Sequence, residues 1–393
     1  TSPVVSISEK APVFDALLTM ERRGLHHLLV TGPEGEIKGA VRSAELAPFR
    51  DYGPLVLARD LALGDSPEAM ADHAARIPSL VHALIEGGAA PAQVSELLST
   101  ACDTAACRLI EIAQRELGDP PCAFSWVALG SHGRQEMTLT SDQDNALVYE
   151  QETEGAKEYF RALAEKVNSG LEACGFNACP GGVLARNPQW RLPLSEWRRK
   201  FTEWIALPEP QPLMEFTIIF DLRSVWGDHR LVQALREHIW EETRRRPGFY
   251  PLFAQSALQF RPPVRLFGRL IGGESPSRLD VKEALMPLSG FARLYALKHQ
   301  AVSTGTRSRL QELAGLEILR AQTVQDSMKA FDGLQGLRLR SQSESAVSGR
   351  TPSNEIVLSE VTPDQLAQIQ SALAQIAALQ AKIGHDFLGG SPP

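Results

Sequence analysis

The chain has 393 residues, of which 43% are hydrophobic and 22% charged, a composition typical of a globular protein with more than one core. A formal net charge of -7 excludes a general attraction to nucleic acid, so we expect no duplex DNA or RNA partner and only local phosphate binding. The five cysteines lack metal-binding spacing, and no stretch has the length of a membrane span or the pattern of a secretion signal. We therefore expect a cytoplasmic protein that binds no membrane.

Residues 1–62 have the pattern of a small α/β unit. Pro12 opens a predicted helix, and three short apolar runs predict strands at 4–7, 27–30 and 36–41. The phrase ERRGLHHLLVTGPEGEIKGAVRSAEL resembles one CBS module, a unit that normally works in pairs and often binds adenine nucleotides. Arg42 and Glu45 stand where nucleotide-binding CBS modules often have Thr and Asp, which leaves ligand binding open. A single module exposes the face that a second copy would bury, so we expect a homodimer through this unit.

Residues 63–118 are expected to form a helical lead-in that packs on the next domain. Apolar residues from 94 to 113 recur at helical spacing up to the break at Gly118-Asp119-Pro120-Pro121. Residues 119–245 alternate predicted strands with helices, which indicates an α/β sheet domain. Its predicted strands are 124–129, 145–149 and 214–220.

Residues 246–393 favour helices. Amphipathic stretches at 279–297, 307–319 and 365–383 predict a C-terminal helical bundle. The segment 341–354 is rich in Ser, Gly and Pro and is predicted to be a mobile loop. The bundle carries no paired-carboxylate motif on a strand, so we expect it to cover the acceptor side of a cleft rather than to join a metal site.

The strongest chemical signal is WVALGSHGRQEMTLTSDQDNALVY, residues 126–149. An apolar strand leads into Gly130 and Ser131, where backbone N–H groups at the start of a helix would face a bound phosphate. Asp142 and Asp144 begin the next strand, and an alternation of period two puts both carboxylates on one face. Two carboxylates at that spacing can share divalent metal ions.

A Gly-Ser pair followed about ten residues on by Asp-x-Asp resembles the DNA polymerase beta nucleotidyltransferase superfamily, although Gln143 stands where that superfamily usually has an apolar residue. The phrase GSHGRQEMTLTSDQDNALVY is similar to the nucleotidyltransferase family joined to CBS and cyclic-nucleotide-binding domains, which is related to PII uridylyltransferases. Phrases at 179–205, 220–228 and 279–299 also match, so the resemblance covers nearly the whole chain. It implies an α/β multidomain protein: a partial CBS unit, a helical lead-in, a DNA polymerase beta-like nucleotidyltransferase α/β domain and a C-terminal helical bundle.

The resemblance also implies a chemistry. Asp142 and Asp144 would bind Mg2+ (or Mn2+), with a nucleoside triphosphate (NTP) as substrate. Asp221, at the end of MEFTIIFD, matches the third metal-binding carboxylate of the superfamily, and its simpler alternative is a strand-end residue paired with Arg223. Three carboxylates would hold two metal ions for in-line attack on the α-phosphorus, with pyrophosphate leaving.

Other polar residues around the motif have more than one interpretation. Arg134, one short turn after Ser131, is predicted to contact the β- or γ-phosphate with its fork of donors, and the alternative is a surface arginine. Glu136 could orient Arg134 or be solvated. His132 has no recognisable catalytic partner in the sequence and is interpreted as a residue that takes no part in the chemistry.

The segment 179–205 is rich in tryptophan and arginine. Asn187 and Trp190 are predicted to lie beside the nucleotide. Trp197 and Trp204, seven residues apart on one helical face, are expected to pack in the core instead.

The sequence thus predicts an enzyme that moves a nucleoside monophosphate from an NTP to a protein or small-molecule hydroxyl and is regulated by the CBS module. A second hypothesis is a non-catalytic nucleotide-sensing signal-transduction protein that acts through a partner. A third, weaker one is a small-molecule nucleotidyltransferase of the antibiotic-modifying kind. The pair His385-Asp386 lacks the upstream histidines of a His-Asp phosphohydrolase, so we reject that activity.

Overall fold

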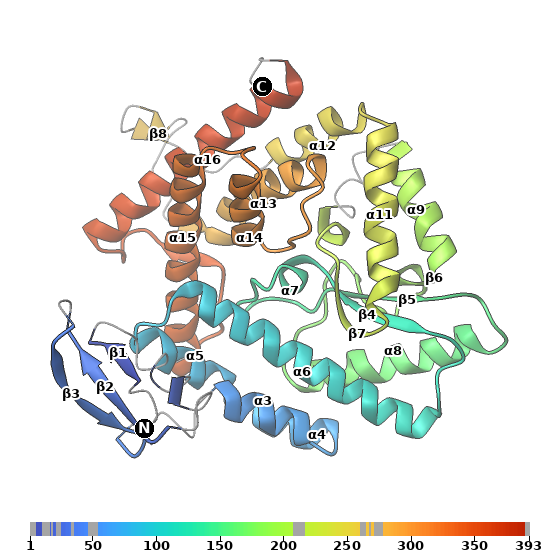
Figure 1. Cartoon of the computed structure of the whole chain (residues 1–393), viewed down its shortest axis with the longest axis horizontal. Helices are drawn as coiled ribbons and strands as arrows, with labels where there is room; N and C mark the ends of the chain where they lie inside the picture. Colours follow the sequence, from blue (N-terminus) through green and yellow to red (C-terminus); the bar gives the residue numbers. More distant parts are fainter. Residues whose placement is uncertain are drawn as a thin grey trace.

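The computed structural model describes residues 5–9, 16, 19–20, 25–32, 35–45, 54–206, 217–259, 265–266, 269–270 and 278–389 (Figure 1). Among the described helices, none combines the length and the low polarity that crossing a membrane requires. The chain is a mixed α/β protein in which helices predominate.

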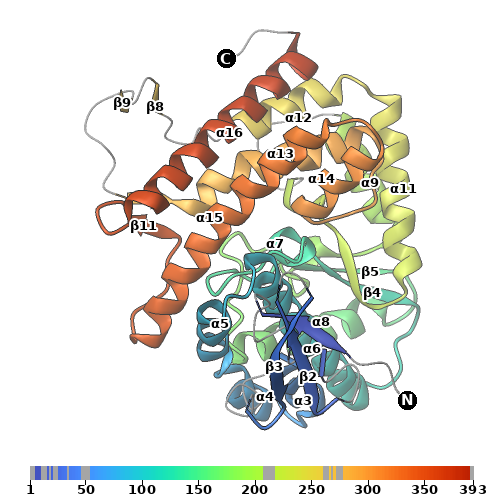
Figure 2. The same ribbon diagram turned by 60° about the vertical axis from the view of Figure 1, so that its left-hand side comes forward.

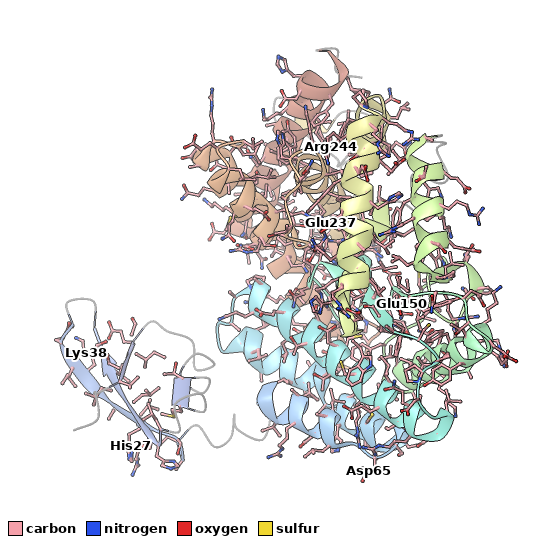
Figure 3. The ribbon with its side chains drawn as sticks, turned by 45° about the vertical axis from the view of Figure 1, so that its right-hand side comes forward. His27, Lys38, Asp65, Glu150, Glu237 and Arg244 are labelled. Carbon is pink, nitrogen blue, oxygen red and sulfur yellow. The ribbon has the colours of Figure 1, made fainter. Side chains whose placement is uncertain are left out.

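The N-terminal unit contains a three-stranded sheet of β1 (Ser6–Ser8), β2 (His27–Thr31) and β3 (Ile37–Arg42). β1 runs parallel to β2, and β2 runs antiparallel to β3. The three predicted strands are therefore present, and most of the helix predicted at Pro12 lies outside the described residues. Arg42 and Glu45 form an exposed ion pair of 2.7 Å with each other. In Figure 3 this unit, in which His27 and Lys38 are labelled, stands separate from the helices of the rest of the chain.

The helical lead-in consists of α3 (Pro54–Leu63), α4 (Pro67–Ala74), α5 (Ile77–Glu86) and α6 (Pro91–Leu117). The side chain of Ser66 caps α4 by accepting a hydrogen bond of 3.2 Å from the Ala69 N–H. Gly118 ends α6 with a φ of +83°, at the break that the sequence predicts. α6 then lies against the central sheet domain.

The central sheet has the strand order β6-β5-β4-β7. Its strands are β4 (Phe124–Ala128), β5 (Asn145–Tyr149), β6 (Arg191–Pro193) and β7 (Arg223–Gly227). β4 pairs antiparallel with both β5 and β7, whereas β5 pairs parallel with β6. Every residue of β4 and β5 is buried, and this double-sided burial explains why apolar residues predominate in both strands.

Two helical layers cover the two faces of this sheet (Figure 1). Trp126 and Leu147 pack with α6 and α8 (Ala156–Ala173). Val127 and Val148, their neighbours along the strands, pack with α9 (Leu194–Ala206) and α11 (His229–Arg245). This alternation follows from the period of two along a strand.

The third predicted strand of this domain, 214–220, is wrong over its described part. Residues 217–219 are helical, residues 214–216 lie outside the described residues, and β7 begins only after Asp221. The segment before Asp221 is the more apolar, but Ile219 is buried in the core while half-buried β7 takes the place beside β4. Asp221 consequently lies in a turn before a strand rather than at the end of one.

The C-terminal part is helical, with α12 (Phe249–Leu258), α13 (Val281–Lys298), α14 (Thr306–Gly315), α15 (Ala321–Val347) and α16 (Pro363–Leu388). Two short strand pairs accompany them: β8 (Arg265–Leu266) with β9 (Arg269–Leu270), and β10 (Arg278–Asp280) with β11 (Glu355–Val357). α15 and α16 lie side by side (Figures 1 and 2). Residues 341–347, predicted as loop, are the last turns of α15.

One hydrophobic cluster joins the sheet domain to the helical domain. It contains Val127 and Val148 of the sheet together with Phe291, Leu334 and Ile376 of the C-terminal helices. Burial of this apolar surface holds the two domains against each other. The candidate site lies where these domains meet.

Candidate active site

A cavity of about 260 Å³ lies between the sheet domain and the helical domain. Six residues singled out from the sequence line it from the sheet side: Gly130, Ser131, Arg134, Glu136, Asp142 and Asp144. The structure therefore brings the Gly-Ser pair, the arginine and the two aspartates to one place.

Gly130 allows the turn after β4 to lie directly against Asp144. Its φ is +54°, and a Cβ atom at this position would stand 2.6 Å from Asp144 Oδ2. The following helix α7 (Gly130–Gly133) has a single turn, so its first N–H groups have no partner within the helix. These N–H groups suit a phosphate oxygen.

A buried amide network sets the direction of the two aspartates. Gln143 and Asn145 alternate with them along the chain and are fully buried. Gln143 Nε2 donates to the carbonyl of Phe176 at 3.1 Å, and its Oε1 accepts from Asn145 Nδ2 at 3.1 Å and from Asn168 Nδ2 at 2.9 Å. Because Gln143 and Asn145 are held inside, Asp142 and Asp144 must face the cavity. This network explains Gln143, for which the sequence offers no account.

The two aspartates are partly buried carboxylates with raised pKa values. Burial raises the pKa of Asp144 to about 6, although the Cys179 thiol donates a hydrogen bond that opposes the shift. Burial also raises the pKa of Asp142, against the attraction of Lys282. A divalent cation would offset this cost of charge burial, so the pair fits a metal ion.

Replacement of Asp144 tests the free-energy cost of burying its charge. At about pH 7.5, Asp144→Asn is expected to raise the free energy of unfolding of the ligand-free protein by on the order of 1–2 kcal/mol, allowing for the partial exposure of the side chain. A raised pKa means that the folded state binds the proton more tightly than the unfolded state. The native protein should therefore gain stability as the pH falls from about 6 to 4, and the difference from the mutant should vanish. Urea denaturation at both ends of this range measures it, and a less stable mutant at pH 7.5 would contradict the assignment.

Asp221 lies at the centre of a buried cluster of arginines. Its side chain is fully buried, and three guanidinium groups donate to its two oxygens. Arg134 reaches Oδ2 at 2.6 Å, Arg309 reaches Oδ1 at 2.6 Å, and Arg293 reaches both oxygens at 3.0 and 2.7 Å. Burial alone would raise the pKa of Asp221, but the charges of these arginines outweigh it and hold the pKa far below the usual range.

This environment does not fit the predicted metal ligand. Both oxygens of Asp221 are occupied by cations, and Asp221 is not among the residues that line the cavity. Nor is the simpler alternative present, because Arg223 pairs with Asp103 at 2.8 Å. Within the described part of the chain, no group of three or more His, Cys, Asp or Glu residues is placed to hold a metal ion. We therefore assign Asp221 a structural role.

Glu136 orients Arg134. Glu136 Oε2 accepts from Arg134 Nε at 2.6 Å, and its Oε1 accepts from the backbone N–H of Thr306 at 2.5 Å. Thr306 opens helix α14, so this carboxylate connects the catalytic motif to the helical domain. Of the two interpretations of Glu136, the orienting one is confirmed.

His132 has a partner that the sequence did not reveal. Its Nε2 lies 2.6 Å from Asp103 Oδ1, and Asp103 also accepts from Arg223 Nη1 at 2.8 Å. His132 is buried behind the Gly130-Ser131 turn, where these contacts join the turn to α6 and β7. Asp103 lies 29 residues earlier in the chain, so no local pattern pointed to it.

Two predicted nucleotide contacts lie elsewhere. Trp190 is buried in the core, with its ring stacked on Trp197 and Lys200 placed 4.3 Å from the ring centre. Asn187 Nδ2 donates to the carbonyl of Gly182 and so closes a turn. Neither lines the cavity, and the prediction that they contact the nucleotide is not supported. Trp197 and Trp204 are core residues, as expected.

The helical domain also lines the cavity and supplies three cations to it, Lys282, Arg293 and Arg338. Lys282 of α13 lies close enough to Asp142 and Asp144 to favour their ionised forms. The helical domain therefore covers the cavity, and the expectation that it joins no metal site stays a prediction. These residues are far from the motif in sequence, and only the packing of the domains brings them near it.

A glycine-bounded phosphate turn facing two aspartates, on a sheet domain covered by a helical domain, defines a nucleotidyltransferase-type protein. Comparison with protein families agrees. Residues 75–211 match the family described as "Putative nucleotidyltransferase DUF294", residues 247–387 match "Putative nucleotidyltransferase substrate binding domain", and residues 1–48 match the CBS domain. The chain belongs to this CBS-associated nucleotidyltransferase family, as its sequence predicts. A search of curated proteins found no match.

Proposed function

We propose that the protein transfers a nucleoside monophosphate from an NTP to a hydroxyl group of a protein or small molecule, in the manner of PII uridylyltransferases. The CBS unit would regulate this transfer. The observation that carries the proposal is the shared cavity, in which the Gly130-Ser131 turn, the Asp142–Asp144 pair and cations from a second domain face one another. Phosphoryl chemistry needs this combination of metal-binding carboxylates and phosphate-binding donors.

The residues of the cavity have separable roles. Asp142 and Asp144 would hold a divalent ion, Mg2+ or Mn2+, which when bound supplies Lewis-acid stabilisation of the charge on the triphosphate. Ser131 and the N–H groups of its turn would bind a phosphate oxygen. Arg134 is held in place by Glu136 and Asp221, so its guanidinium needs little further ordering to meet a phosphate.

One observation favours a second candidate function. The described residues provide two facing carboxylates but not a third, because Asp221 is committed to arginines. A site of this kind could bind a nucleotide without turning it over. The protein would then be a nucleotide-sensing signal-transduction protein that acts on a partner.

A transfer assay separates these functions. The full chain is incubated with each of the four NTPs labelled at the α-phosphate, with Mg2+ or Mn2+, and with a lysate of the source organism as acceptor. Metal-dependent label on an acceptor, together with release of pyrophosphate, is expected for one NTP and should be lost in Asp142→Asn. Saturable nucleotide binding without any transfer or pyrophosphate release would contradict the enzymatic function and support the nucleotide-sensing function.

A further inference from the structure

Arg338 is a buried cation without a buried counter-charge. It lies on α15, lines the cavity and is only 6% exposed. Its Nε donates to Asn354 Oδ1 at 2.8 Å, and within the described part of the chain no carboxylate lies at ion-pair distance from it. Burial lowers the pKa of Arg338 to about 10, and the attraction of Asp280 offsets this shift only in part.

The other arginines of the cavity differ in this respect. Arg134 pairs with Glu136 and Asp221 at 2.6 Å, and Arg293 pairs with Asp221 at 2.7 Å. Each of these two arginines therefore has a carboxylate at ion-pair distance inside the protein. A buried guanidinium left without such a partner costs folding free energy, and sites that bind an anion commonly carry a cost of this kind.

Arg338 is tied to the loop that carries the aspartates. Asn354 Oδ1, which holds Arg338, also accepts from Thr140 Oγ1 at 2.8 Å and from Gln342 Nε2 at 3.2 Å. Thr140 precedes Asp142 by two residues, so one amide positions both the arginine and this loop. Lys282 reaches the same region from α13.

We propose that Arg338 and Lys282 form an anion subsite on the helical-domain side of the cavity, and that it binds the terminal phosphates of the nucleoside triphosphate. The choice of a triphosphate rests on the proposed function, whereas the subsite itself rests on the unpaired cations. A polyphosphate has several phosphate groups, so one of them can contact a metal ion on Asp142 and Asp144 while another contacts the cations of the helical domain in the same cavity. The planar fork of Arg338 suits two phosphate oxygens.

The test measures binding of three ligands to the full chain by calorimetry at constant ionic strength: an NTP, the corresponding monophosphate, and inorganic tripolyphosphate. Arg338→Gln should weaken tripolyphosphate and NTP binding by about 10- to 100-fold, the range of charge-assisted hydrogen bonds, and change monophosphate binding by less than about 3-fold. Lys282→Gln removes an exposed charge and should give a smaller loss of the same kind. The matched control is Arg340→Gln, two residues along the same helix, where the side chain is 47% exposed and pairs with Glu86. It should bind all three ligands normally.

Folding of the variants is measured in parallel. Without ligand, Arg338→Gln should be as stable as the native protein or more stable, since it removes an uncompensated buried charge. Arg338→Lys keeps the charge, so it should bind tripolyphosphate more tightly than Arg338→Gln does. If Arg338→Gln fails to fold, tripolyphosphate binding by Arg338→Lys and Lys282→Gln tests the subsite instead.

The outcomes are distinct. Undiminished tripolyphosphate binding by the Arg338 and Lys282 variants overturns the subsite, as does a native protein that binds no tripolyphosphate. A loss of transfer with normal NTP binding also overturns it, because the cations would then serve the acceptor. A last outcome is tripolyphosphate binding that depends on Arg338 but shows neither metal dependence nor a preference for NTP. This result supports the anion subsite and contradicts the proposed nucleotidyltransferase function.

Discussion

Asp221→Asn is expected to destabilise the folded protein by about 3–5 kcal/mol, enough to unfold much of it at moderate temperature. The carboxylate of Asp221 is the shared counter-charge of Arg134, Arg293 and Arg309, and an amide of equal size carries no charge. Three buried guanidinium groups would then repel one another across the domain interface. The three arginines lower the pKa of Asp221 in the folded state. The ionised carboxylate therefore stabilises the folded protein above about pH 4, and this stabilisation is lost only in stronger acid, as the pH falls through the folded-state pKa.

Chemical denaturation of the ligand-free protein measures this effect, with Asp142→Asn as the control for loss of a carboxylate at the cavity. A metal ligand and a structural anion give opposite results here. Removing a metal ligand leaves the metal-free protein as stable as before or more stable, whereas removing the structural anion destabilises it. A stable, soluble Asp221→Asn protein that has lost metal binding would restore Asp221 to the metal site.

The double substitution Asp142→Asn and Asp144→Asn is expected to abolish Mg2+-dependent nucleotide turnover without unfolding the protein. Burial raises the pKa of both carboxylates, so their amides relieve unfavourable charge and should leave the ligand-free protein equally stable or more stable. With Mg2+ and nucleotide at a hundredfold excess over the dissociation constant, the native protein should gain about 2.7 kcal/mol by ligand linkage. The double mutant should gain much less.

Thermal denaturation with and without Mg2+ and nucleotide measures both quantities. Asp228→Asn is a suitable control, because Asp228 is an acidic helix cap outside the residues that line the cavity. It should keep the full ligand shift. A double mutant that is shifted as strongly as the native protein would show that these aspartates do not hold the metal ion.

The sequence by itself determined the family, the helical and sheet elements with strong periodicity, and the turn and aspartates of the site. These features are local. Gly130 and Asp144 meet because one strand ends shortly before the next begins, so the fifteen residues from 130 to 144 contain all the information. The predominance of apolar residues in β4 and β5 likewise indicates their double-sided burial without reference to any other segment.

Only the tertiary structure showed the partners of Asp221 and Gln143 and the burial of Arg338 beside the cavity. Asp221 had the residue type and approximate position of a metal ligand, but its role depends on arginines from helices 72 and 88 residues later in the chain. Arg338 sits on a helix whose buried face contains polar residues, so hydrophobic periodicity gave little sign of that helix or its orientation. The charge state and the role of a buried polar group depend on the partners that folding places around it, and in this protein most of those partners come from the other domain.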